Sequence, residues 1–221
     1  MNCCQCQGIE TVFNRREAEK KLKAYRKRGP AKTTRMLIEA LQSMARRNEG
    51  LTLLDIGGGV GAVQHELLRS GVQQATGVDA SAAYVRVAQE EAQRQGHADR
   101  MRSVHANFVD FAAHIPRADV VTLDRVICCF HDMPALVGLS AAKAAALYGL
   151  VYPRDTWWVR AAIGIANLYM RAARNPFRAF VHPSRGVEAL VKSHGFERCF
   201  YKTSGAWQVV VYARERRDRR G

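Results

Sequence analysis

The residues best suited to chemistry form a glycine-rich segment early in the chain. It reads Leu53-Leu54-Asp55-Ile56-Gly57-Gly58-Gly59-Val60-Gly61, an apolar run that leads into glycines. Glycine lets a ligand approach the backbone closely and adopts positive φ torsions that cost other residues free energy. A helix that begins after such a loop offers free N–H groups to an acidic group. We therefore expect this segment to bind the acidic part of a cofactor.

Two carboxylates accompany this loop. Asp79 lies 24 residues after Asp55, where it can accept hydrogen bonds from both hydroxyls of a ribose. Asp55 stands just before the loop, where it would repel a pyrophosphate but suits a cofactor that carries an ammonium and a sulfonium. Gly57, Gly59 and Ala62 also fit the nicotinamide pattern G-x-G-x-x-A, so NAD(P) is the alternative cofactor.

The elements that must position these residues alternate along the chain. Short apolar runs alternate with helix-like segments, as in a parallel sheet covered on both faces. Strands are expected over 51–55, 75–79, 101–105, 118–124 and 147–152, and helices over 63–69, 82–95 and 134–146. This pattern predicts a doubly wound α/β fold.

The end of the chain departs from this alternation. After a helix expected over 186–193, apolar segments over 196–202 and 206–213 are joined by the turn Thr203-Ser204-Gly205. Two strands joined by so short a turn pair antiparallel. The prediction is a mostly parallel, seven-stranded sheet with an antiparallel C-terminal hairpin. Ordinary dinucleotide-binding domains do not end in this way.

On the loop, Asp79 and the hairpin, residues 51–213 resemble a class I S-adenosylmethionine (SAM)-dependent methyltransferase with a Rossmann-like fold. The resemblance implies SAM as cofactor, with its methionine part at Asp55 and the glycines and its ribose at Asp79. The segment His105-Ala106-Asn107-Phe108 matches the family's adenine contact, with Asn107 in place of the usual aspartate; an amide oxygen can still accept from the adenine amino group. The cofactor-binding residues expected are Asp55, Gly57, Gly58, Gly59, Gly61, Asp79, Ala80, Asn107, Phe108 and Asp124.

The methyl acceptor is expected over the ends of the fourth and fifth strands, near Asp124, Arg125 and His131. Methyl transfer mainly requires alignment of the acceptor and exclusion of water. His131 can deprotonate a hydroxyl acceptor; a solvated loop histidine is the alternative.

Two short segments resemble one branch of the family. Residues 123–129 and 179–182 are similar to O-methyltransferases of the magnesium-protoporphyrin and ubiquinone pathways. The magnesium-protoporphyrin enzymes typically have His-Tyr-Pro where this chain has Cys128-Cys129-Phe130.

Two segments are expected to cover the acceptor. One is an amphipathic helix over 10–28 that ends at Gly29-Pro30, followed by a helix capped by Thr33 or Thr34. The other is the apolar, arginine-flanked stretch 156–180, which fits a flat apolar acceptor with carboxylates or an anionic membrane surface; ordinary helix packing is the alternative. The expected acceptor contacts are Tyr25, Arg125, Trp157, Trp158 and Tyr169.

The chain is expected to form a single domain. Its parts are a helical cap over 1–50, a SAM-binding core over 51–155, a lid insertion over 156–185, a closing helix and hairpin over 186–213, and a basic tail over 214–221.

Charge and cysteine content restrict the setting. The formal net charge is +14, and residues 14–35 hold ten Lys or Arg against two Glu, a local net of +8. The first residues lack a secretory pattern, and the longest apolar stretch is shorter than the roughly 20 residues of a membrane span, so a cytoplasmic protein is expected. One cluster, Cys3, Cys4 and Cys6, does not supply four zinc ligands alone. We expect no metal, with a site shared with Cys128 or Cys129 as the alternative.

These features together favour methyl transfer from SAM to an oxygen of a small or medium hydrophobic metabolite that carries carboxylates. The basic ends leave an RNA methyltransferase as an alternative, although no Asn-Pro-Pro-Tyr-like base-flipping motif follows the fourth strand. A NAD(P)-dependent reductase and a non-catalytic SAM-binding or membrane-surface protein are the others. Peripheral membrane contact stays open, and the oligomeric state is not indicated.

Overall fold

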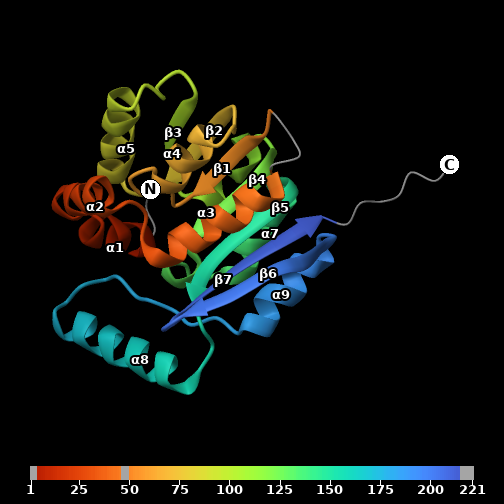
Figure 1. The fold of residues 1–221 in the computed structure, drawn as a ribbon. Helices are drawn as coiled ribbons and strands as arrows, with labels where there is room; N and C mark the ends of the chain where they lie inside the picture. Colours follow the sequence, from red (N-terminus) through yellow and green to blue (C-terminus); the bar gives the residue numbers. More distant parts are fainter. Residues whose placement is uncertain (1–3, 46–49, 215–221) are drawn as a thin grey trace.

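A seven-stranded sheet with the strand order β3-β2-β1-β4-β5-β7-β6 forms the centre of the protein (Figure 1). The computed structural model describes residues 4–45 and 50–214. The strands are β1 (Thr52–Ile56), β2 (Gln74–Asp79), β3 (Met101–His105), β4 (Ala118–Asp124), β5 (Ala144–Pro153), β6 (Phe196–Ser204) and β7 (Trp207–Arg214). Strands β1 to β5 pair parallel, and β7 pairs antiparallel with both β5 and β6. The predicted Rossmann-like methyltransferase fold with a closing hairpin is confirmed.

Helices cover both faces of this sheet. One face carries α3 (Lys32–Ala45), α4 (Ala62–Arg69) and α5 (Ala82–Arg94), and the other carries α6 (Phe108–Phe111), α7 (Met133–Lys143) and α9 (Ser184–Ser193). Neighbouring strand residues serve opposite faces: Leu53 and Val120 belong to the first core, Leu54 and Val121 to the second. This alternation follows from the two-residue period of a strand.

The strand order reverses between β1 and β4, since β2 lies on one side of β1 and β4 on the other. Chains leaving the carboxyl ends of β1 and β4 therefore diverge and leave room for a ligand between them. Asp55 and Asp124 lie on these two strands, so the fold places both predicted acids at this switch point.

The N-terminal region differs from the single helix expected over 10–28. It forms α1 (Cys4–Val12) and α2 (Arg15–Arg28), separated at Asn14. The Asn14 side chain accepts a hydrogen bond of 3.2 Å from the Glu17 N–H and so caps α2, which ends at Gly29 with φ of 71° as expected. An N-cap asparagine starts a helix because it satisfies an N–H that lacks a helical partner.

Two other local expectations are corrected. The helix expected over 134–146 ends at Lys143, and Ala144 already pairs with Ala118 in the sheet. Alanine favours helix, but burial beside a neighbouring strand outweighs that small preference. Thr33 and Thr34 lie inside the first turn of α3 rather than capping it, because the helix begins at Lys32.

Helix α8 (Trp157–Ala172) stands apart from the two helical layers, at the lower left of Figure 1. Across 4–45 and 50–214, no helix is long and apolar enough to cross a membrane.

Candidate functional site

Three carboxylates meet at the carboxyl ends of the central strands: Asp55 on β1, Asp79 on β2 and Asp124 on β4. Burial raises the pKa of Asp55 to about 7, although hydrogen bonds from Thr122 and Gln64 oppose this, and the nearby charges of Asp124 and Asp79 add to it. A site that gathers mutually repelling carboxylates is relieved by a positively charged ligand.

Asp55 is held by two side chains that the sequence analysis missed. Thr122 on β4 donates from Oγ1 to Asp55 Oδ1 at 2.6 Å, and Gln64 on α4 donates from Nε2 to Oδ2 at 3.1 Å. The Gln64 side chain lies so close to the loop that a Cβ on Gly58 would be 2.3 Å from its Nε2. The spacing of Gln64 six residues after Gly58 gave no recognisable signal, because its role depends on where α4 packs.

The glycine loop adopts the backbone that the sequence analysis expects. The φ angles are 65° at Gly57, 57° at Gly59 and 81° at Gly61. A Cβ on Gly57 would also be 2.3 Å from Val126 Cγ2, so this glycine lets the segment after β4 approach the loop. The loop and the end of β4 therefore form one continuous wall of the site.

Asp79 lies beside this loop. Its Oδ2 accepts a hydrogen bond of 3.0 Å from Gly59 N–H, and its Oδ1 accepts one of 2.8 Å from Ser81 N–H. Burial raises the pKa of Asp79, and these two N–H groups oppose the rise. Each carboxylate oxygen still has a lone pair for a ribose hydroxyl.

The proposed adenine contact is also in place at the end of β3. Asn107 caps α6: its Oδ1 accepts from Val109 N–H at 3.3 Å and its Nδ2 donates to Asp110 Oδ2 at 2.8 Å. Phe108 is buried in the core beneath it. The capping bond leaves Asn107 Oδ1 one further lone pair, so a role toward adenine stays a prediction.

Asp124 and Arg125 form a strained junction after β4. Arg125 has φ of 61°, a conformation that non-glycine residues rarely adopt and that clusters at functional sites. Its Nη2 donates to Thr33 Oγ1 at 2.8 Å, and its guanidinium lies 4.9 Å from the ring centroid of Trp207. Thr34 donates from Oγ1 to Asp124 Oδ2 at 2.5 Å. Neither threonine contact is visible in the sequence.

Two buried atoms of this junction make no hydrogen bond within the described part of the chain. They are Asp124 Oδ1 and Arg125 Nε, which lie 3.9 Å apart. Burial raises the pKa of Asp124, while the hydroxyl of Thr34 and the charge of Arg125 oppose the rise. A buried carboxylate oxygen with hydrogen-bonding capacity left over suits a ligand ammonium.

The two expected covers meet over the site. The rings of Phe13 and Phe177 are in edge contact, with centroids 5.7 Å apart, and Ser81 Oγ donates to Phe13 carbonyl oxygen at 2.6 Å. The chain returning from α8 then lies on the segment after β4, because Phe180 N–H donates to the Cys128 carbonyl at 2.8 Å. The stretch 177–182, rather than α8 itself, thus closes over the site together with the N-terminal helices.

The expected acceptor residues separate into groups. Arg125 is in the site, whereas Tyr25 packs on α4, where its hydroxyl donates to Glu66 Oε1 at 2.9 Å. Trp157, Trp158 and Tyr169 lie exposed on α8. His131 is exposed too, with its ring stacked on Phe130 at 5.4 Å between centroids. Its role as a base stays a prediction.

The cysteines fall into two groups. Cys128 and Cys129 lie after β4 with their Sγ atoms 3.8 Å apart. Of the N-terminal cluster, Cys3 and the side chains of Cys4 and Cys6 lie outside the described residues. Among the residues that the structure does describe, no three His, Cys, Asp or Glu side chains are grouped as metal ligands.

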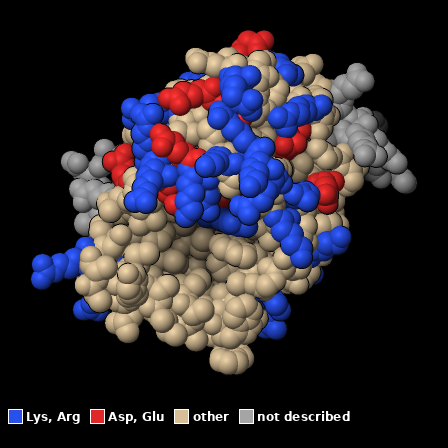
Figure 2. All heavy atoms as spheres, turned by 60° about the vertical axis from the view of Figure 1, so that its left-hand side comes forward, with Lys and Arg blue, Asp and Glu red and all other residues tan. Residues whose placement is uncertain are grey.

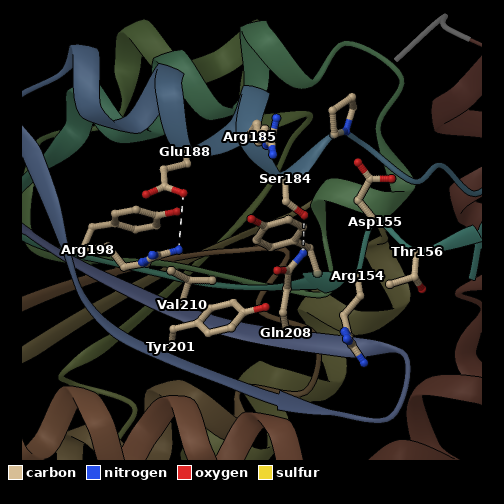
Figure 3. Close-up of a pocket in the computed structure, with 13 residues that line it drawn as sticks. Arg154, Asp155, Thr156, Ser184, Arg185, Glu188, Arg198, Tyr201, Gln208 and Val210 are labelled. Atoms are coloured by element: carbon tan, nitrogen blue, oxygen red, sulfur yellow. Dashed lines mark hydrogen bonds and ion pairs between the residues drawn. The ribbon is translucent and has the colours of Figure 1, made fainter.

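A separate cavity of about 330 Å³ lies between α9 and the hairpin (Figure 3). Its lining includes Arg154, Glu188, Arg198, Tyr201 and Gln208, and Arg198 pairs with Glu188 at 3.4 Å. None of the three carboxylates of the switch point lines this cavity. It is therefore distinct from the predicted cofactor site.

Comparison with known proteins gives one family and a set of similar structures. The model of a family described as "Methyltransferase domain" matches residues 24–198, well over half of the chain. No curated protein has a significant match to the sequence.

Among solved structures, magnesium protoporphyrin IX methyltransferase (ChlM) from Synechocystis PCC 6803 with bound S-adenosylhomocysteine (SAH) is similar at 17% identity and a TM-score of 0.74, over 96% of this chain and 100% of that chain. The same enzyme with bound SAM has a TM-score of 0.71 at 16% identity, over 96% and 97% of the two chains. An O-methyltransferase family protein from Burkholderia thailandensis is 16% identical with a TM-score of 0.65, over 82% of this chain and 56% of that one. At these identities the likeness establishes the fold.

Proposed function

The chain belongs to the methyltransferase domain family as a SAM-dependent enzyme, and we propose that its acceptor atom is an oxygen of a small or medium hydrophobic metabolite that bears carboxylates. When bound, SAM supplies a methyl group activated by its positive sulfonium. The remaining tasks, which are binding, orientation and exclusion of water, fall to residues of this chain.

The meeting of Asp55, Asp79 and Asp124 at the switch point carries the proposal. Buried carboxylates that raise one another's pKa suit a ligand with an ammonium and a sulfonium and oppose a pyrophosphate. We assign the ribose hydroxyls to Asp79, the ammonium to the neighbourhood of Asp124, and the adenine to Asn107 and Phe108. The same charge argument disfavours NAD(P).

The cover supports an acceptor that is apolar and closed off from water. Phe13, Phe177 and Phe180 come together from the two covering segments, and Arg125 supplies a positive charge beside them that suits a carboxylate. We propose that residues 156–185 act as the lid and that His131 takes the acceptor proton. The neighbours named as magnesium protoporphyrin IX methyltransferase and O-methyltransferase family protein support oxygen as the acceptor atom.

Isothermal titration calorimetry with SAM and with SAH tests the cofactor site. The expected result is binding of both compounds and loss of affinity by at least about tenfold in the Asp79→Ala variant, since two charge-assisted hydrogen bonds are removed. Asp99→Ala, which removes an exposed carboxylate, should bind normally. Absence of binding to both compounds by the folded wild-type protein contradicts the proposal.

Transfer of a labelled methyl group from SAM tests the acceptor class. Carboxylated porphyrins and carboxylated phenols form the first panel, and an amine series tests oxygen against nitrogen. Labelling confined to amines contradicts the assignment of oxygen.

RNA is the second candidate acceptor, and the basic surface over α2 favours it. Figure 2 shows Lys and Arg gathered across one face of the protein, and α2 alone has eight of them against two Glu. An RNA acceptor would be labelled in a strongly salt-dependent reaction, because bound phosphates release counterions. Labelling of RNA, with none of the metabolite panel, replaces the first candidate with the second.

A further inference from the structure

Helix α8 turns a large apolar face away from the protein. The exposed fractions are 81% for Trp157, 40% for Trp158, 71% for Ile165, 68% for Leu168 and 72% for Tyr169. Between Arg160 and Arg171 the helix has no charged side chain. Apolar side chains gathered in this way mark an interaction surface.

The opposite side of α8 is the one that holds it to the protein. Val159 is buried, and the Asn167 side chain pairs with both backbone groups of Ala179, at 2.8 and 2.9 Å. At 3.6 residues per turn, Val159 and Asn167 share that inner side, while Trp158, Ile165 and Tyr169 lie on the outer one. A helix that is apolar on both sides is normally covered on both. The described residues cover only the inner side.

Positive charge surrounds this face. Arg154, Arg160, Arg171, Arg174 and Arg178 lie on α8 or beside its ends, against Asp155, a local net of +4 (five Arg minus one Asp). Asp155 is already paired with Arg160 at 2.5 Å. Both α2 and α8 lie on the left of Figure 1, the side that comes forward in Figure 2, where the basic band stands above a broad uncharged area with a hollow in it. One side of the protein thus combines cations with exposed apolar side chains.

We propose that the outer face of α8 binds the surface of an anionic lipid membrane, with the helix lying in the plane of the interface. Apolar side chains such as Ile165 and Leu168 enter the acyl boundary, and Trp157 and Tyr169 are of the types that prefer the headgroup level. The arginines at both ends of α8 and the cations of α2 attract the acidic headgroups. A second copy of this chain suits the face less well, because self-association through α8 would bring two sets of arginines together.

Flotation with lipid vesicles tests this proposal on the full chain. The vesicles are pure phosphatidylcholine in one series and an equal mixture of phosphatidylcholine and phosphatidylglycerol in the other. We expect binding to the anionic vesicles at low salt and a blue shift of tryptophan emission as Trp157 leaves water. Two of the three tryptophans lie at the start of α8, so the emission reports on this helix.

Matched variants distinguish insertion of α8 from general charge attraction. Ile165→Asp should weaken vesicle binding by at least tenfold and remove the blue shift. Leu139→Asp introduces the same charge at an exposed leucine (38% exposed) on α7 and should bind like the wild type. Unchanged SAH affinity in both variants shows that each is folded, and this readout is independent of the vesicles.

Other results overturn the proposal. Equal binding by Ile165→Asp and the wild type means that charge alone attaches the protein. A blue shift without vesicles that grows with protein concentration, together with a dimer in sedimentation that Ile165→Asp abolishes, assigns the face to a second copy instead. No flotation with the anionic vesicles at low salt excludes a lipid surface.

Discussion

Thr34 on α3 donates a hydrogen bond of 2.5 Å to Asp124 at the end of β4, although 90 residues separate the two in the chain. The bond joins the N-terminal helices to the switch point of the sheet. The next threonine contact, from Arg125 to Thr33 at 2.8 Å, reinforces the same junction. The N-terminal helices are therefore part of the site as well as its cover.

Replacing Thr34 by Val should destabilise the protein by about 1–2 kcal/mol, because a buried carboxylate oxygen loses its donor. The loss should be greater at pH 8 than at pH 5, since ionised Asp124 needs the donor most. Urea denaturation measures the change. Thr34→Ser keeps the hydroxyl and should retain most of the stability; equal losses in the Ser and Val variants would show that packing, not the hydrogen bond, matters.

Asp55 should make the protein less stable as pH rises. Its pKa is raised to about 7 in the folded protein from an ordinary value of 3.8, so between these pH values the folded state binds more protons than the unfolded state, and stability falls with increasing pH. By linkage the full effect is about 4 kcal/mol. Denaturation at pH 5 and pH 8 measures it.

The Asp55→Asn variant isolates this contribution, because other groups also titrate in the same range. The difference in stability between the variant and the wild type should shift in favour of the variant as pH rises from 4 to 8. A pH-independent difference would show that Asp55 is ionised throughout. Saturating SAM should reduce the pH dependence of the wild type, since a bound cation favours the ionised carboxylate.

Glu91 should have the opposite pH behaviour. Its buried carboxylate accepts from Arg26 on α2 at 2.5 Å and from Arg94 at 2.6 Å. Burial opposes ionisation, but hydrogen bonds from Arg94, Arg26 and Gln95 lower the pKa of Glu91 to about 2. The stability that it contributes is present above its ordinary pKa of 4.5 and is lost as pH falls toward 2.

Glu91→Gln should therefore destabilise the protein at pH 7 by about 1–2 kcal/mol, a modest value because both arginines are half exposed. Thermal denaturation at pH 7 and pH 3 measures the difference, which should shrink at the lower pH. Glu90→Gln, on the solvent side of the same helix, is the control. A penalty that persists undiminished at pH 3 would contradict the ionic role.

Gly57→Ala should disrupt the cofactor loop. The new Cβ would meet Val126 Cγ2 at 2.3 Å, in addition to the cost of φ of 65°. Gly96→Ala has nearly the same φ, 70°, but no atom within 4 Å, so it should lose only about 1–2 kcal/mol. SAM titration and denaturation compare the two variants. The double change Gly57→Ala with Val126→Ala should recover part of the lost stability, and no recovery would argue against the proposed clash.

Local sequence signals predicted most of the sheet. Strands β3 and β4 lie at the expected residues, because buried parallel strands need continuous apolar runs and these are short and sharply bounded. The boundary between α7 and β5 was missed, since the alanines around Ala144 have no strand preference of their own and pair with β4 only in the assembled sheet. The break at Asn14 was also missed, although its capping side chain was a readable signal.

The sequence by itself determined the cofactor loop and two of its acids. A loop with positive φ at Gly57 needs glycine wherever it occurs, and a carboxylate at Asp55 or Asp79 follows its own strand, so both are properties of short segments. Only the tertiary structure decided that Gln64 and Thr122 hold Asp55, that Thr34 reaches Asp124, and that α8 exposes Trp157 and Ile165 while residues 177–182 close over the site. The reason is physical: contacts between distant segments depend on the packing of whole helices against the sheet, and helical periodicity shows that a face is apolar but not what covers it.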